Sequence, residues 1–129
     1  MGVIGLDHVQ VAAPRSAGVE EEARAFYGGL LGLPEIEKPD ALKPKGGVWF
    51  SLGRGELHVG LEDDFRPARK AHPALVVEDV DGLRQRIEVT EYETADAEEG
   101  AICLPCTHCS EFGAGAGGCD LRVEVSHCA

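Results

Sequence analysis

The same local pattern, a histidine-bearing strand followed by an amphipathic helix, occurs twice in this chain of 129 residues. The side chains of residues 5–13 alternate in polarity as in a half-buried strand, and residues 19–31 then place apolar side chains at helical spacing. Residues 72–78 and 80–87 repeat this order. A long pattern that occurs only twice predicts a duplicated supersecondary unit and argues against a solenoid.

Two further strands are expected between the two halves of this duplication. Residues 47–53 and 56–62 each alternate, and the glycines that join them are typical of a tight turn, so the two strands should form a hairpin. Residues 35–46 are expected to be a loop. For the first helix, Ser16 is the expected N-cap and Gly32 the expected end.

The last third of the chain is a different kind of sequence. Residues 1–88 carry 15 acidic and 11 basic side chains and no cysteine, whereas residues 89–129 carry 8 acidic side chains, one basic side chain and all five cysteines. Residues 91–97 and 121–126 are expected to be strands, and residues 103–118 a loop. An altered reading frame near residue 89 would explain this abrupt change.

A second explanation for the tail is a metal site. Cys103, Cys106 and Cys109 follow one another at intervals of three, with His108 among them and Cys119 beyond. Thiolates at this spacing suit zinc or an iron–sulfur cluster. A structural zinc ion therefore remains the alternative to an altered frame.

Charge and hydropathy exclude several classes of partner. A net charge of -11 argues against nucleic acid and against an anionic membrane surface, because both are bound by clustered Lys and Arg. No apolar run approaches the roughly 20 residues that a spanning helix needs. The start of the chain lacks the basic and apolar regions of a secretory signal, so a cytoplasmic location is expected.

The histidines of residues 1–88 share one feature of position. His8, His58 and His72 each lie on the strand face opposite the aliphatic one, and Glu124 does so on the last expected strand. Imidazole and carboxylate ligands together suit Zn, Ni, Co, Mn or Fe(II). A site with an open coordination position would make the metal a Lewis acid or an activator of water. The alternative is that each histidine is an ordinary hydrogen-bonded surface residue.

Several segments together resemble a known family. Residues 5–11 (GLDHVQV), 25–33 (AFYGGLLGL) and 56–60 (ELHVG) resemble the vicinal oxygen chelate superfamily. That superfamily includes glyoxalase I, bleomycin- and fosfomycin-resistance proteins, extradiol dioxygenases and methylmalonyl-CoA epimerase. Residues 71–75 (AHPAL), followed by residues 79–83 (DVDGL), resemble the opening of its second module.

The resemblance implies an α+β fold of two βαβββ modules that form a curled mixed sheet with a cleft, usually in a homodimer. The modules would span residues 1–64 and 65–129, with the second atypical or incomplete over residues 89–129. Its metal ligands would be His8 and His72 on the first strands of the modules, and His58 and Glu124 on the last. The usual family ending Asp-Pro-Phe-Gly-Asn-Arg-Ile-Glu-Leu is missing, and residues 121–125 are the nearest match.

The expected function is that of a glyoxalase-like lyase or isomerase that binds a small oxygen-bearing substrate to a divalent metal. Such a metal would stabilise enolate-like charge, and Glu124 or Glu56 would move a proton. Trp49 would line the cleft, although a core or dimer contact is an equally plain interpretation. Arg69, in the basic segment of residues 66–70 (RPARK), would attract an anionic substrate, although a solvated linker is the plainer interpretation. The alternatives are an extradiol-type dioxygenase and a non-catalytic, bleomycin-resistance-like dimer that binds a drug or metabolite.

Overall fold

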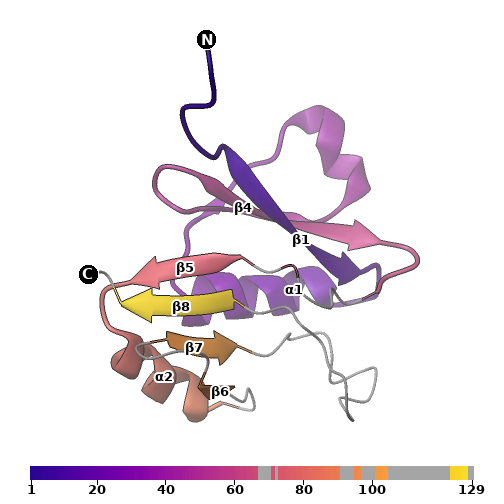
Figure 1. Cartoon of the computed structure of the whole chain (residues 1–129). Coiled ribbons are helices and arrows are strands. Elements are labelled where there is room, and N and C mark those ends of the chain that lie inside the picture. The colour runs from indigo at the N-terminus through magenta and orange to yellow at the C-terminus, as the bar shows by residue number, and fades with distance from the viewer. Residues whose placement is uncertain (67–70, 72, 91–94, 97–100, 105–122, 128–129) are drawn as a thin grey trace. The chain divides into compact units, whose positions relative to one another are not determined.

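The computed structural model of the chain describes residues 1–66, 71, 73–90, 95–96, 101–104 and 123–127. The chain divides into two compact units, Met1–Phe65 and Arg66–Ala129. Each unit contains one four-stranded sheet and its own helical segment (Figure 1). Among the described residues, no helix is both long and apolar enough to cross a membrane.

The sheet of the first unit has the strand order β1-β4-β3-β2. The strands are β1 His8–Pro14, β2 Glu35–Ile36, β3 Val48–Ser51 and β4 Glu56–Glu62. β1 runs parallel to β4, and the other neighbouring pairs are antiparallel. The hairpin expected over residues 47–62 is therefore confirmed as β3 and β4, and the first strand is confirmed with a later start.

The prediction that residues 35–46 form only a loop is wrong. This segment contains β2 and a 3-10 helix, η2, at Asp40–Lys45. β2 is only two residues long, which is too short to show alternation in a sequence. Pro39 occupies the N-cap of η2 and starts its turn without a side-chain cap.

The first helix is confirmed in position but differs in its geometry and its cap. α1 at Val19–Ala23 continues directly into a π-helix, η1, at Arg24–Leu30. The N-cap is Gly18, at φ 83°, and not Ser16 as predicted. Glycine adopts this left-handed conformation without the steric penalty of other residues, so the chain turns into the helix at Gly18 without help from a side chain.

One face of the first sheet packs against this helix and forms the core of the unit. Fully or almost fully buried apolar side chains come from the sheet (Val11, Ala13, Val48, Phe50, Leu57 and Val59) and from the helix (Val19, Ala23, Phe26 and Tyr27). Burial of a side chain the size of Phe50 or Leu57 stabilises a fold by about 1.5–3 kcal/mol. Since the helix covers this face, the opposite face of the sheet carries the polar side chains of β1, β3 and β4.

The second unit repeats the topology of the first. Its elements are β5 Ala74–Val77, α2 Val80–Glu88, β6 Ala95–Asp96, β7 Ala101–Leu104 and β8 Val123–His127. The strand order is β5-β8-β7-β6, with β5 parallel to β8 and the other neighbouring pairs antiparallel. The first and last strands of each unit are thus parallel neighbours.

Helix α2 begins and packs as its sequence predicts. The Asp79 carboxylate accepts a hydrogen bond of 2.9 Å from the backbone N–H of Gly82, which is an N-cap interaction. Val80, Leu83 and Ile87 form its buried stripe.

The α+β fold with βαβββ units is therefore confirmed, although its second half differs from expectation. All four strands of the second unit are present, and β6 is only two residues long. The expectation that this unit is atypical or incomplete over residues 89–129 stays a prediction, because much of that range lies outside the described residues. The loop predicted for residues 103–118 is wrong at Cys103, which lies in β7 and pairs with Glu124 and Ala95. The remaining residues of that segment, including Cys106 and Cys109, lie outside the described part of the chain.

Candidate functional site

Three flat rings form a column on the polar face of the first sheet. The His58 ring on β4 stacks on the Trp49 indole of β3, with ring centroids 3.7 Å apart and planes inclined by 2°. The His8 ring of β1 stacks on His58 at 4.3 Å and 15°. Because β4 lies between β1 and β3, the other two rings approach His58 from its two neighbouring strands.

A carboxylate holds each of the two histidines. His58 Nε2 lies 2.7 Å from Glu56 Oε2, and His8 Nδ1 lies 2.8 Å from Asp7 Oδ2. An ionised carboxylate only accepts hydrogen bonds, so in each pair the histidine nitrogen is the donor. In the neutral imidazoles the electron pair then resides on Nδ1 of His58 and on Nε2 of His8. Carboxylate–histidine pairs of this kind accompany histidines that bind metals.

The two histidines differ strongly in environment. The His58 side chain is 5% exposed, whereas the His8 side chain is 46% exposed. Their partners are Glu56, at 38%, and Asp7, at 92%. His58 is thus a buried and firmly surrounded group, and His8 is a half-exposed one at the edge strand of the sheet.

Gln10 is a neighbour of this column that the sequence analysis did not single out. It lies opposite His58 in the β1–β4 pairing. Its amide also fills the space above Gly60, because a Cβ at Gly60 would lie 2.6 Å from Gln10 Nε2. The sequence did indicate that Gln10 is a neighbour of this column, because it lies two residues after His8 and therefore on the same strand face.

Trp49 and Glu56, both predicted site residues, line a common cavity. It has a volume of about 530 Å³, and its other lining residues are Glu37, Lys38, Pro39 and Asp40. It is wide open to solvent, and is therefore a shallow surface depression and not an enclosed pocket. The lining of this space by Trp49 does not test its predicted role in a cleft, which stays a prediction.

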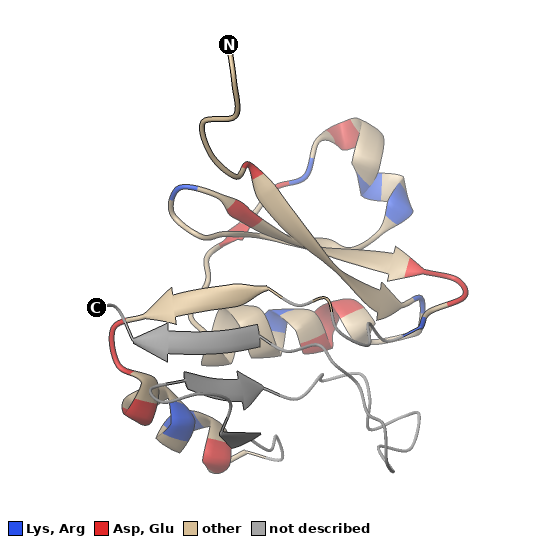
Figure 2. Ribbon diagram, viewed as in Figure 1, with Lys and Arg blue, Asp and Glu red and all other residues tan. Residues whose placement is uncertain are grey.

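The charges at the rim of this cavity largely compensate one another. Lys43 Nζ donates to Glu37 at 2.6 Å and lies 2.7 Å from Asp40 Oδ1. The hydrogen bond from Lys43 lowers the pKa of Glu37, and hydrogen bonds to Asp40 and Glu37 raise the pKa of Lys43. Figure 2 shows both signs of charge along η2 (Asp40–Lys45).

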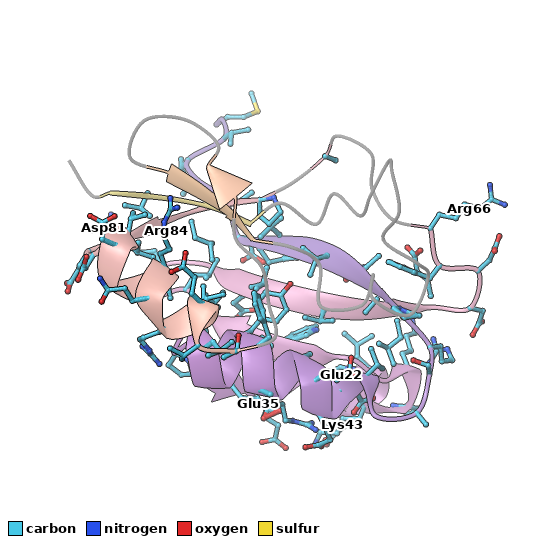
Figure 3. The ribbon with its side chains drawn as sticks, turned by 90° about the horizontal axis from the view of Figure 1, so that it is seen from below. Glu22, Glu35, Lys43, Arg66, Asp81 and Arg84 are labelled. Atoms are coloured by element: carbon cyan, nitrogen blue, oxygen red, sulfur yellow. The ribbon has the colours of Figure 1, made fainter. Side chains whose placement is uncertain are left out.

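A second cavity, of about 440 Å³, shares Trp49, Glu37 and Lys38 with the first. Glu35 and Lys43, labelled in Figure 3, also line it. Arg24 donates to Glu35 at 2.8 Å, and this hydrogen bond is the main cause that raises the pKa of the Arg24 guanidinium.

The remaining predicted site residues belong to the second unit. His72 and Arg69 lie outside the described residues. Glu124 is described by its backbone pairing alone, and it lies in β8 opposite Ala74 of β5. The structure therefore brings together His8, His58, Glu56 and Trp49.

The register of the two parallel strand pairs relates the predicted ligands to one another. In the first unit, the partner of His58 is Gln10, which lies two residues after His8. In the second unit, the partner of Glu124 is Ala74, which lies two residues after His72 in the sequence. His58 and Glu124 thus occupy equivalent register positions in the two units.

The residue types at this site suit a divalent metal, but the present arrangement of the rings does not. Two imidazoles with carboxylate partners are suitable donors for Zn, Ni, Co, Mn or Fe(II). Within the described ranges, however, no three His, Cys, Asp or Glu side chains are grouped closely enough to hold an ion. The stacked planes of His8 and His58 also do not converge on one point close to both rings.

Paired βαβββ units with the same strand order define the class of protein to which this chain can be compared. A glyoxalase family protein from Bacillus anthracis is 39% identical over 100% of this chain and 98% of its own length, with a TM-score of 0.76. The chain therefore belongs to the glyoxalase family of the vicinal oxygen chelate superfamily.

More distant structures share the fold. Lactoylglutathione lyase from Agrobacterium tumefaciens is 19% identical over 95% of this chain and 92% of its own length, with a TM-score of 0.59. The fosfomycin resistance protein FosX from Listeria monocytogenes is 14% identical over 99% and 96%, with a TM-score of 0.67. No protein-family model and no curated protein sequence matches the chain.

Proposed function

We propose that this chain is a metal-dependent, glyoxalase-like lyase or isomerase that acts on a small oxygen-bearing substrate. The observation that carries the proposal is the pair of carboxylate-held histidines, His8 and His58, on the polar face of the first sheet. Membership of the glyoxalase family supports it.

His8, His58, His72 and Glu124 would hold the metal. The equivalent register of His58 and Glu124 supports the inclusion of Glu124, because a duplicated unit tends to present its functional side chains from equivalent positions. A divalent ion bound there would act as a Lewis acid toward substrate oxygen atoms.

Glu56 serves first to orient His58, since its carboxylate accepts the Nε2 hydrogen bond. Its side chain remains 38% exposed and lines the cavity of about 530 Å³, so it is also within reach of a small molecule placed there. Glu56 is therefore a candidate for proton transfer to or from bound substrate, along with Glu124.

Trp49 would contribute an apolar wall to the substrate site. One of its faces is covered by His58, and the ring also lines the cavity that holds Glu56. We further propose that the chain acts as a homodimer, and sedimentation of the purified protein measures this directly.

The test is the metal content of the purified full-length chain and of single variants. His8→Ala, His58→Ala and His72→Ala should each bind less Zn, Ni, Mn, Co or Fe(II) than the unaltered chain. Gln10→Ala is the matched control, because it truncates a neighbour on the same face without removing a ring nitrogen. Equal metal content in all five proteins would refute the metal site.

Activity assays then separate the reactions. Turnover of a hemithioacetal would identify a glyoxalase-type isomerisation, and oxygen uptake with catechols would identify a dioxygenase. A chain that binds metal and turns over neither substrate class would remain a glyoxalase family member with another substrate.

A further inference from the structure

The stacked histidines pose a geometric problem for any ion that they share. The electron pair of an imidazole nitrogen lies in the plane of its ring, and a nitrogen–metal bond is about 2.0–2.1 Å long. The planes of His8 and His58 are inclined by only 15°, with centroids 4.3 Å apart. Planes that are stacked at so small an angle meet only many ångströms beyond the rings. The two histidines cannot both bind one ion in this arrangement.

For both histidines to bind one ion, one of the two rings must therefore turn. The surroundings of His58 hold its ring much more firmly than the surroundings of His8 hold the other. His58 is 5% exposed, lies flat against Trp49 at 3.7 Å, and donates to Glu56. To rotate, it would have to lose the Trp49 stack, break a hydrogen bond and displace packed neighbours. Such losses are costly in a close-packed interior.

His8 is much less constrained. Its side chain is 46% exposed, and its hydrogen bond goes to Asp7, whose side chain is 92% exposed. An exposed hydrogen bond of this kind exchanges readily with water and contributes little to stability. His8 also lies at the first residue of β1, which is an edge strand of its sheet.

We infer that the ring column consists of a fixed pair, Trp49 and His58, and a movable ring, His8, which Asp7 positions in the stacked state. His8 leaves the stack when it binds an ion together with His58. The release of His8 by a bound ion rests on the proposed function, whereas the division into fixed and movable rings concerns the metal-free chain. Asp7 is thus a positioning residue that acts through His8.

The first experiment uses the metal-free full-length chain with isotope-labelled histidine and tryptophan. Ring–ring nuclear Overhauser effects should be strong between Trp49 and His58, and relaxation dispersion should detect exchange for the His8 ring and not for the His58 ring. Asp7→Ala should weaken the His8–His58 cross peaks and leave the Trp49–His58 cross peaks unchanged. Glu56→Ala is the matched control, since it removes the carboxylate of the fixed ring. Equal rigidity of both histidines, or no effect of Asp7→Ala, would overturn the inference.

The second experiment adds one equivalent of Zn²⁺ to the same sample. The shifts of both imidazoles should change and the His8–His58 cross peaks should lose their stacked pattern, because two rings that bind one ion meet at their nitrogens instead of face to face. The Trp49–His58 cross peaks should remain. Loss of the Trp49–His58 contact with retention of the His8–His58 contact would show that the wrong ring was assigned as movable. If Zn²⁺ changes no ring signal, the proposed metal function fails, and the metal-free experiment alone decides whether His8 is the movable ring.

Discussion

Gly47 lies just before β3, at a point where two strands approach too closely for any side chain. Its φ of +93° is in the left-handed region. A Cβ added there would lie 2.3 Å from the carbonyl oxygen of Val59, which is far inside van der Waals contact. Because Val59 lies in β4 and is only 2% exposed, its carbonyl oxygen is part of a buried strand and cannot move away from the added Cβ without disturbing that strand.

Gly53 provides a matched control for Gly47→Ala. It has a similar φ of +88°, but a Cβ there would meet nothing within 4 Å. Gly53→Ala should therefore carry only the cost of a left-handed non-glycine residue, about 1–2 kcal/mol. Gly47→Ala should add the cost of displacing the Val59 carbonyl and its hydrogen bonding, about 1–3 kcal/mol more. The expected destabilisation by Gly47→Ala is about 2–5 kcal/mol in total.

Urea unfolding followed by fluorescence measures this difference directly. Trp49 is the single tryptophan of the chain and lies in the same unit as both glycines, so its emission reports the unfolding of that unit. The two variants should have equal m-values and clearly different midpoints. Free energies of unfolding that agree within about 0.5 kcal/mol would refute the assigned contact between β3 and β4.

Two further predictions concern a helix cap and a surface carboxylate. Asp79→Ala should destabilise α2 by about 0.5–2 kcal/mol, because the N-cap hydrogen bond to Gly82 is lost. Hydrogen exchange of the α2 amides measures this loss, with Asp81→Ala as the control. Equal exchange rates in the two variants would contradict the prediction. The lowered pKa of Glu37 means that its contribution to stability is present above its ordinary pKa and is lost as pH falls through the folded-state pKa. Lys43→Met removes both the hydrogen-bond donor and the charge that cause this shift, so an NMR titration should show the Glu37 pKa rising toward its ordinary value. An unchanged pKa would disprove the assigned partner.

The sequence predicts the elements of this fold well where side chains repeat over several residues. Residues 56–62 alternate without interruption, and β4 has these bounds. Helix α2 combines an Asp at the cap with apolar residues at helical spacing, and both features are present in the structure. In each case a local pattern and the tertiary packing favour the same conformation.

Prediction fails where the structure depends on short or unusual backbone geometry. The two residues of β2 pair with β3 at the edge of the sheet, and no local pattern in the sequence indicates this pairing. The π-helical turns of η1 place Gly28 next to the Phe50 ring, 3.6 Å from the position of an added Cβ. This close approach between helix and sheet is a tertiary requirement that the helical spacing of apolar residues does not reveal.

The candidate site, like the fold, could be predicted from the sequence only in part. Alternation correctly placed His8 and His58 on the polar face of the sheet, where Trp49 also lies. It could not show that the three rings stack, because stacking depends on which strands are neighbours. The chain order of the strands differs from their order in the sheet, where β4 lies between β1 and β3.

The parallel pairing of first and last strands explains why a duplicated βαβββ unit suits a site of this kind. A single unit brings two side chains from distant parts of its sequence, such as His8 and His58, to neighbouring strands on the face that its helix leaves uncovered. Two donors are too few to hold a divalent ion firmly and still leave an open position, since catalytic zinc sites use about three protein ligands. In the proposed site a second unit with the same register would supply the further donors, and in this chain the residue at the register position equivalent to His58 is Glu124. If Glu124 completes the proposed site, its carboxylate would add one negative charge to neutral imidazole donors, and such a mixed set suits Zn, Ni, Co, Mn or Fe(II).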